Sequence, residues 1–204
     1  MIKVGIINYG LGNIRSIIGA ITYMGFDYIY SSDFKELDSC EVIVLPGVGA
    51  FPSGMKNLKQ NKLDTYLCNH LKNRPLIGIC LGMQLLFSTG YEFKTTKGLG
   101  LIEGEVVRFN PDSGLRVPNI GWDKLINHDF DFLEDEKFYF VHSYHVKPKE
   151  KSVITSESTF GMETFISSVQ KENIYGFQFH PEKSAYAGIL FLKKIITKSV
   201  KKNG

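Results

Sequence analysis

The chain has 204 residues, 43% hydrophobic and 22% charged, which is typical of a globular protein and excludes a disordered, collagen-like or disulfide-rich chain. Its net charge of +3 comes from residues 189–204, which contain five lysines and no acidic residue, whereas residues 1–188 contain 19 basic and 21 acidic side chains. A nucleic-acid-binding surface is therefore not indicated, because a terminal helix that ends in lysines suits its own dipole equally well.

The first half of the chain predicts alternating strands and helices. Three short apolar runs predict strands at Lys3–Ile7, Glu41–Leu45 and Pro75–Ile79. After the first of them comes a glycine-rich turn, and apolar residues then recur at helical spacing from Ile14 to Met24, until Gly25 ends the helix. A second helix is predicted within residues 63–71. Strands joined by crossover helices are parallel, so this half predicts an α/β layer fold.

From about residue 100 the pattern changes to short strands separated by polar turns. The predicted strands are Glu103–Phe109, Phe138–Val141, Val153–Thr155, Thr164–Val169 and Ile174–Phe179. Turns are predicted at Pro111–Gly114 and Lys149–Ser152, and a closing helix at Ala187–Lys198. We expect this half to be largely antiparallel. No repeat or linker divides the chain, so a single domain spanning residues 1–204 is predicted.

Composition also bears on location and on bound ions. No apolar stretch approaches the roughly 18–20 residues of a membrane span, and the first residues do not resemble a signal peptide. The cysteines, Cys40, Cys68 and Cys80, are odd in number and lack the spacing of metal ligands. We therefore expect a cytoplasmic protein with free thiols, no metal and no cofactor.

The most informative motif follows the third predicted strand. Residues Gly78–Gly82 read Gly-Ile-Cys-Leu-Gly and lead directly into an apolar helix, which has the form of a nucleophile elbow. The helix N-terminus would favour a thiolate and offer the Leu81 N–H to an oxyanion. A lone cysteine is more often a core residue, and we keep that interpretation for Cys40 and Cys68, which no glycines flank. Cys80 is predicted to be a nucleophile exposed at the top of the sheet.

A base and its orienting partner are predicted at His180-Pro181-Glu182, where an apolar strand ends. Residues two apart share a face of a strand, so the Glu182 carboxylate can accept the second ring N–H of His180 and fix its tautomer. The proline between them favours an extended conformation at His180. Alone, the His-Pro-Glu motif is weak evidence of a catalytic site. Together with the elbow it is strong evidence, because a cysteine nucleophile needs an oriented base.

Residues 78–84 and 178–182 together resemble the class I, or triad, glutamine amidotransferases. The resemblance covers nearly the whole chain and is narrower for the glutaminase subunits of imidazole glycerol phosphate synthases, carried by residues 9–13, 46–51, 119–122, 140–144 and 182–184. It implies a flavodoxin-like α/β fold, with a central mixed, mostly parallel sheet flanked by helices and an added antiparallel sheet. It also implies that Cys80, His180 and Glu182 hydrolyse glutamine to glutamate and ammonia.

Further site residues follow from these motifs. The glycines of residues 46–49 would let a backbone N–H act as a second oxyanion donor, so the predicted donor segments contain Gly47, Val48, Gly49 and Leu81. Gln84 lies one helical turn after Cys80 and can contact the amino-acid end of the substrate. The resemblance adds the substrate-binding segment His142, Ser143 and Tyr144.

The resemblance also implies a partner, a (β/α)8-barrel synthase subunit that forms a heterodimer with this chain and receives its ammonia. The interface residues that it implies are Asn13, Trp122, Asp123, Tyr139 and Lys183. Asp123 stands where the family usually has Asn, and Asn119 where His or Gln is frequent. A carboxylate in the docking segment suggests an alternative, a paralogous subunit that supplies ammonia to another barrel synthase, for example to amidate a nucleotide sugar in surface polysaccharide synthesis.

Three other functions are weighed against this interpretation. The Gly10-x-Gly12 turn is reminiscent of dinucleotide binding, but the third glycine is replaced by Arg15. A non-catalytic binding protein on the same scaffold would be favoured by loss of a triad residue, yet all three are present. A standalone cysteine hydrolase or peptidase would turn over esters or peptides without a partner.

Overall fold

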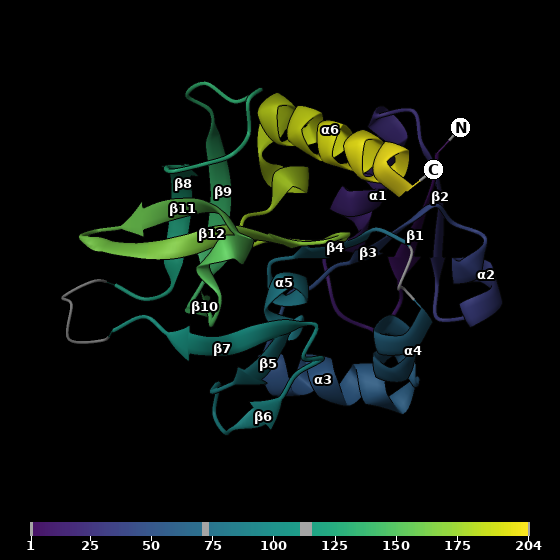
Figure 1. The fold of residues 1–204 in the computed structure, drawn as a ribbon, viewed down its shortest axis with the longest axis horizontal. Coiled ribbons are helices and arrows are strands. Elements are labelled where there is room, and N and C mark those ends of the chain that lie inside the picture. The colour runs from purple at the N-terminus through teal and green to yellow at the C-terminus, as the bar shows by residue number, and fades with distance from the viewer. Residues whose placement is uncertain (1, 71–73, 111–115, 204) are drawn as a thin grey trace.

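The computed structural model describes residues 2–70, 74–110 and 116–203, and a large sheet runs through it (Figure 1). In these ranges the sheet has eleven strands: β1 (Lys3–Ile7), β2 (Asp27–Ser31), β3 (Val42–Leu45), β4 (Leu76–Ile79), β5 (Phe87–Gly90), β6 (Thr96–Lys97), β7 (Ile102–Arg108), β10 (Tyr144–Pro148), β11 (Ile154–Phe160), β12 (Glu163–Lys171) and β13 (Ile174–Phe177). Their order is β2-β1-β3-β4-β13-β12-β10-β7-β5-β6, and β11 pairs with β12 outside this row. A second, antiparallel sheet joins β8 (Asn119–Lys124) and β9 (Lys137–His142).

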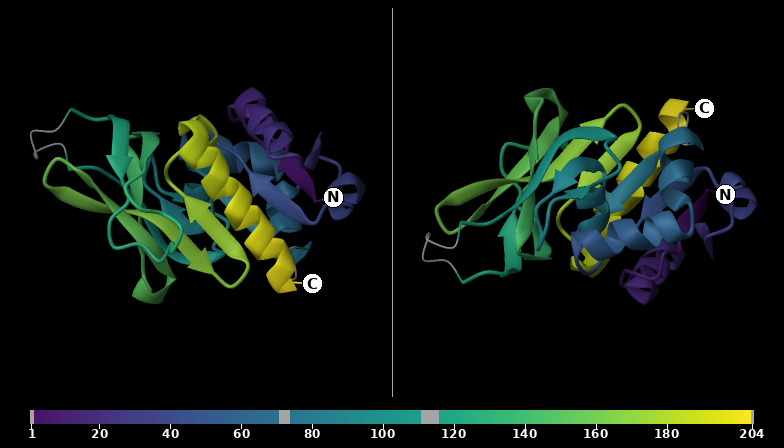
Figure 2. Two further views of the ribbon diagram at one scale, coloured as in Figure 1. Left: turned by 90° about the horizontal axis from the view of Figure 1, so that it is seen from above. Right: turned by 90° about the horizontal axis from the view of Figure 1, so that it is seen from below.

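Helices cover both faces of the parallel part of the sheet. They are α1 (Ile14–Tyr23), α2 (Phe34–Asp38), α3 (Phe51–Gln60), α4 (Leu63–His70), α5 (Leu81–Leu85) and α6 (Ala185–Asn203), with short 3-10 turns η2 (Lys151–Val153) and η3 (Pro181–Lys183). Figure 2 shows α6 lying across one face and α3 across the other. In the described part of the chain, no helix combines the length and the apolar character needed to cross a membrane.

The parallel strands are buried on both faces, as their apolar sequences predict. Alternate side chains of β3 enter two different core clusters: Ile43 packs with the cluster that contains α3 and α4 residues, and Val44 with the cluster that contains α1 and α6 residues. The expected α/β arrangement with a mixed central sheet is therefore confirmed. The carboxyl ends of β3 and β4 consequently lie side by side, and each is followed by a glycine-containing turn.

The predicted elements of the first half are confirmed, but several others were missed. None of the sequence patterns described above indicates β2, α2, α3, β5, β6, β8 or β10. Strand β2 is a mostly exposed edge strand, so it lacks the apolar run that identifies its neighbours. Helix α3 has Pro52 at its start and Gly54 inside it, which lower its intrinsic helix propensity. Its burial against α5 stabilises it instead.

The second half contains the predicted strands with shifted ends. Antiparallel pairing is confirmed for β10 with β7, β11 with β12 and β12 with β13. The exception within this largely antiparallel half is the other edge of β13, which pairs in parallel with β4, Gly176 opposite Gly78. The chain returns through the β12–β13 hairpin into the middle of the sheet. Val153 lies in η2, whereas β11 extends to Phe160. The turn predicted at Pro111–Gly114 lies outside the described residues.

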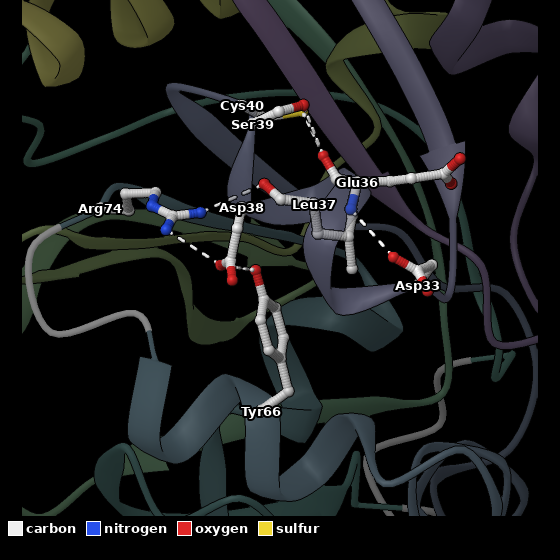
Figure 3. A network of polar contacts seen from close by, with 8 residues as sticks. All are labelled: Asp33, Glu36, Leu37, Asp38, Ser39, Cys40, Tyr66 and Arg74. Atoms are coloured by element: carbon white, nitrogen blue, oxygen red, sulfur yellow. Dashed lines mark hydrogen bonds and ion pairs between the residues drawn. The ribbon is translucent and has the colours of Figure 1, made fainter.

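A polar network ties α2 to α4 and to the residue that leads into β4 (Figure 3). The Arg74 guanidinium donates to the Leu37 carbonyl at 3.2 Å and lies 3.0 Å from the Asp38 carboxylate, which also accepts the Tyr66 hydroxyl at 3.0 Å. Asp33 caps α2 by accepting the Glu36 N–H. These contacts hold the start of β4, the strand that carries the predicted nucleophile at its other end.

The predicted elbow depends on glycines that allow α5 to approach the sheet closely. A Cβ atom at Gly82 would overlap the carbonyl oxygen of Leu45, and one at Gly78 would lie 2.8 Å from the Gly82 carbonyl. Both clashes are with backbone atoms, so no side-chain rotation can relieve them. The Gly-x-Cys-x-Gly pattern is therefore a packing requirement of this crossing as well as a chemical motif.

We expect Gly82→Ala to lower the free energy of unfolding by at least about 2 kcal/mol, because α5 must move away from β3 to accommodate the methyl group. Denaturant unfolding measures this change. Gly19→Ala in α1 is the matched control, since its Cβ meets no atom within 4 Å, and helix propensity predicts a gain of up to about 1 kcal/mol. Equal stability of the Gly82 variant and the wild type would contradict the close approach.

Candidate active site

Cys80 occupies the sharp turn between β4 and α5. Its φ of 53° lies in the left-handed region that non-glycine residues rarely adopt, as expected of a residue held at a strained functional turn. The Cys80 N–H donates to the Phe177 carbonyl at 2.7 Å, which fixes the turn to β13. The predicted elbow geometry is confirmed, but the prediction of an exposed side chain is wrong. Cys80 is only 6% exposed, and the carbonyl of Val141, near the end of β9, lies 3.9 Å from its Sγ.

His180 and Glu182 form the predicted contact through a different local structure. Nδ1 of His180 lies 2.8 Å from Oε1 of Glu182, and both side chains are 1% exposed. The strand argument for this contact is wrong, because β13 ends at Phe177 and residues 181–183 form the 3-10 turn η3. That turn brings Glu182 back onto the imidazole. The His180 N–H donates to the Tyr139 carbonyl at 2.9 Å, so β9 also positions the base.

The electrostatics of the site favour a protonated imidazole. Burial alone lowers the pKa of His180, but the negative charges that Cys80 and Glu182 can carry outweigh it, and the net pKa is raised. Because Nδ1 is committed to Glu182, Nε2 is the ring nitrogen left for chemistry. It is buried and without a hydrogen-bond partner among the described residues. An imidazolium beside a cysteine sulfur is the arrangement that activates a thiolate nucleophile.

A cavity of about 260 Å³ opens over this group. Besides Cys80 and His180, its lining includes seven of the predicted site residues: Val48, Gly49, Leu81, Gln84, His142, Ser143 and Tyr144. Gly47 and Glu182 are not in the lining; Glu182 lies behind His180, which it contacts. The structure thus brings together the segment after β3, the start of α5, the connection from β9 to β10 and the residue before η3, which are far apart in the sequence.

The backbone segment predicted to supply oxyanion donors packs directly on the start of α5. A Cβ atom at Gly47 would lie 2.6 Å from the Gly82 nitrogen, and Gly49 has a φ of 128° that disfavours any side chain. The hydroxyl of the buried Tyr9 donates to the Pro46 carbonyl at 2.6 Å and anchors the beginning of this segment. Leu81 and residues 47–49 are therefore neighbours, and their assignment as oxyanion donors stays a prediction.

Glu92 is a lining residue that the sequence analysis missed. It follows β5, and its carboxylate accepts the Phe51 N–H at 2.7 Å, at the start of α3. Burial raises the pKa of Glu92, and the Phe51 N–H opposes the rise. Helix α3 has no acidic residue in its first turn and no side-chain cap from its own residues. Glu92 therefore supplies the hydrogen-bond acceptor and the negative charge that the N-terminus of α3 lacks. Because it is the one acidic side chain among the lining residues, it favours a cationic group in the cavity.

Two histidines near the cavity, His142 in its lining and His145 outside it, are buried and neutral. Nδ1 of His142 donates to the Tyr144 carbonyl at 2.8 Å, and burial lowers the pKa of His142 to about 3. Burial also lowers the pKa of His145 to about 4, and its ring stacks on Phe109 at 4.7 Å. The His145 ring lies 3.6 Å from the Glu163 carboxylate, but a neutral imidazole makes this a polar contact and not an ion pair at pH 7.

We expect these histidines to make the protein acid-sensitive. A folded-state pKa below the unfolded value of about 6.5 gives stability that is present above pH 6.5 and lost as the pH falls toward 4. Between pH 7.5 and pH 5 each histidine accounts for about 2 kcal/mol of that loss. Urea unfolding of the wild type and of His145→Asn at both pH values measures it. The variant should lose about 2 kcal/mol less than the wild type over this interval, and an equal loss would contradict the prediction.

Three of the predicted interface residues cluster beside the base. The rings of Trp122 and Tyr139 are 5.9 Å apart, and the Lys183 ammonium lies 5.9 Å above the Tyr139 ring. Trp122 is 46% exposed, so part of its large apolar surface is available to a partner. Asp123, the next residue of β8, is half-buried, and burial raises its pKa. Asn13 precedes α1, which packs against η3.

Comparison with known proteins adds an independent line of evidence. The family model described as "Glutamine amidotransferase class-I" matches residues 6–194. Subunit HisH of imidazole glycerol phosphate synthase from Aquifex aeolicus (strain VF5) is 41% identical over 96% of this chain and 97% of its own length. Subunit HisH 2 of the same enzyme from Vibrio vulnificus (strain YJ016) is 45% identical over 95% and 94%.

Two further similar proteins bear on the length of the match and on the fold. The chloroplastic imidazole glycerol phosphate synthase hisHF of Arabidopsis thaliana is 40% identical over 95% of this chain, but the match spans only 34% of that protein. Among solved structures, a "Crystal structure of glutamine amidotransferase" superimposes with a TM-score of 0.76 at 16% identity, covering 97% of this chain and 98% of the other. At that identity the likeness supports the fold alone.

Proposed function

Because the chain belongs to the class-I glutamine amidotransferase family, we propose that it is the glutaminase subunit of an imidazole glycerol phosphate synthase, acting in histidine biosynthesis. The observation that carries the proposal is the buried His180–Glu182 pair next to Cys80, at the floor of a cavity lined by the predicted substrate segments. Relatives of that name match nearly the full chain at 39–45% identity. Residues 1–204 would act as one domain, in the cytoplasm.

In the proposed reaction the Cys80 thiolate attacks the side-chain carbonyl carbon of glutamine. Backbone N–H groups near Leu81 and residues 48–49 stabilise the oxyanion. The C–N bond breaks as His180 gives its Nε2 proton to the leaving nitrogen, which releases ammonia and leaves a glutamyl thioester. His180 then takes a proton from a water molecule that attacks the thioester, and glutamate leaves as the thiolate is restored. Glu182 holds the imidazole in position throughout.

The cavity also supplies a basis for recognising the amino-acid end of glutamine. The Glu92 carboxylate is the acidic group in the lining, and it would attract the α-ammonium of the substrate. Gln84 and the backbone of residues 143–144 line the same part of the cavity, and hydrogen bonds from them would orient the substrate. A ligand without the α-ammonium should bind weakly, because the half-buried Glu92 would then have no countercharge.

The proposed partner is the synthase subunit, a (β/α)8 barrel that receives the ammonia in a heterodimer. Ammonia is mostly protonated in neutral water, so release to solvent would waste it. The match to the chloroplastic relative leaves about two-thirds of that protein unmatched, which is room for a barrel of about 250 residues. The cluster of Trp122, Tyr139 and Lys183 is a suitable docking surface because it adjoins the catalytic base. The backbone N–H of His180 donates to the Tyr139 carbonyl, so this surface is connected directly to His180.

The nucleotide-sugar alternative rested on Asp123. Relatives at 39–45% identity carry the histidine-pathway name, including the second such subunit of Vibrio vulnificus, and they favour the histidine pathway over that alternative.

The test is glutamate release from glutamine by the purified chain, alone and with the barrel synthase of the same genome plus its ribonucleotide substrate. We expect the loaded synthase to raise turnover strongly, with one ammonia incorporated per glutamate formed. An active chain that this synthase neither binds nor stimulates would contradict the partner assignment. A chain that cleaves esters or peptides, but not glutamine, would contradict the amidotransferase assignment itself.

A further inference from the structure

Gln178 is a completely buried polar residue to which the proposed mechanism gives no role. It lies between the end of β13 and His180, and it is 0% exposed. Its backbone N–H donates to the Ser167 carbonyl at 2.9 Å, so β12 holds its position. Its side chain makes two contacts inside the site: Oε1 accepts from Nε2 of Gln84 at 3.0 Å, and Nε2 lies 3.7 Å from Sγ of Cys80.

The hydrogen bonds define the orientation of both amides. Nε2 of Gln84 has two hydrogens, and they go to the Tyr144 carbonyl and to Oε1 of Gln178, each at 3.0 Å. With its oxygen facing Gln84, Gln178 must present its NH2 group to the Cys80 sulfur. With both of its N–H groups used, Gln84 retains its oxygen as the free acceptor for a substrate group. Reversal of either amide would place two donors or two acceptors against each other.

The contact with sulfur matters for the protonation of Cys80. An N–H donor stabilises a thiolate more than a thiol, because a hydrogen bond to an anion is stronger than one to a neutral acceptor. The Val141 carbonyl, 3.9 Å from the same sulfur, has the opposite effect, since it can only accept from a thiol. Without the Gln178 amide, the sulfur would keep a contact that favours the thiol and lose one that favours the thiolate.

We propose that Gln178 has two roles in the reaction: its NH2 group stabilises the nucleophilic sulfur of Cys80, and its oxygen orients Gln84 toward the substrate. One side chain thus connects the amino-acid end of the substrate site with the nucleophile. The substrate role rests on the proposed function, whereas the sulfur role is a property of the free protein.

Two substitutions separate the two roles. Gln178→Glu keeps an oxygen for Gln84 but places a carboxylate against the sulfur, and Gln178→Met removes both interactions at nearly constant volume. Alkylation of Cys80 by iodoacetamide at pH 7 reports on the thiolate, in a Cys68→Ala background because Cys68 is exposed. We expect alkylation to slow at least about 10-fold in both variants. With the synthase complex, KM for glutamine should rise about 10-fold in Gln178→Met and stay near the wild-type value in Gln178→Glu.

A third variant tests the connection from its other end. Gln84→Met has no side-chain contact with the sulfur, but it frees Gln178 to turn its amide away, so alkylation should slow in this variant too. Gln170→Met is the matched control, because Gln170 is a half-buried glutamine of β12 whose side chain donates to the Glu172 carbonyl, and this variant should behave as wild type.

Thermal unfolding of each variant identifies any loss of folding. Wild-type alkylation rates in folded Gln178→Met and Gln84→Met would overturn the sulfur role, and a wild-type KM in Gln178→Met would overturn the substrate role. Failure of the wild-type complex to hydrolyse glutamine would overturn the proposed function. The alkylation result would still decide the sulfur role, so the two failures are distinguishable.

Discussion

Replacement of Cys80 by alanine is expected to lower glutamine-dependent turnover of the synthase complex by at least about 10³-fold, since no other side chain of the cavity lining can form the thioester. The same complex should still make product from added ammonium salt, because the acceptor chemistry belongs to the partner. Parallel assays with glutamine and with ammonium, both monitored by product formation, check the two statements.

Cys68→Ala is the matched control for this experiment. Cys68 is an exposed thiol on α4 that does not line the cavity over Cys80, and its removal should leave turnover with either nitrogen source unchanged. Glutamine-dependent turnover of Cys80→Ala within 10-fold of wild type would contradict the assignment of the nucleophile. Loss of the ammonium-dependent reaction as well would show that the substitution damages assembly of the complex.

The nucleophile could be predicted because its local structure leaves a strong mark in the sequence. Only glycine fits where α5 approaches the Leu45 carbonyl, so the close crossing required for a strained Cys80 appears as flanking glycines. The contact of His180 with Glu182 was predicted for the wrong reason. The two side chains are in contact because η3 is a tight turn that brings Glu182 back to His180. A proline after His180 is as compatible with that turn as with a strand.

The rest of the site depends on tertiary contacts that no local pattern reports. Glu92 lies in a polar turn without a motif, and its place in the cavity follows from the N–H of Phe51, 41 residues away. Gln178 lies next to Gln84 because β13 pairs in parallel with β4, and that pairing is the part of the topology that the sequence analysis missed. The side chain of Cys80 likewise contacts the end of β9, a strand of the antiparallel half, through the Val141 carbonyl.

The parallel pairing of β13 with β4 is also what makes the catalytic group one unit. Cys80 follows β4 and His180 follows β13, so adjacent strands that run in the same direction deliver both residues to one edge of the sheet. The hydrogen bond from the Cys80 N–H to the Phe177 carbonyl then fixes the end of β4 relative to the end of β13. An antiparallel β13 would have placed His180 at the opposite edge, and the triad could not have formed.

Replacement of Glu182 by glutamine is expected to lower kcat by about 10³–10⁴-fold, the size of effect that follows when the group orienting a catalytic histidine can no longer fix its tautomer. The carboxylate can only accept from Nδ1, which leaves Nε2 for the reaction, whereas an amide can also donate to Nδ1 and put the proton on the wrong nitrogen. Glu182 also contributes to the raised pKa of His180. Its loss should shift the alkaline limb of the kcat/KM profile to lower pH.

The same pair gives a stability prediction with a defined sign. The pKa of His180 is raised above its unfolded value, so the stabilisation is complete below about pH 6.5 and is lost as the pH rises through the folded pKa. Urea unfolding should therefore show the largest difference between wild type and Glu182→Gln below pH 6.5, with a smaller difference in alkaline solution. Glu163→Gln is the control, because its neighbour His145 has a lowered pKa and is neutral. A kcat within 10-fold of wild type in Glu182→Gln would mean that η3 holds the imidazole without the carboxylate.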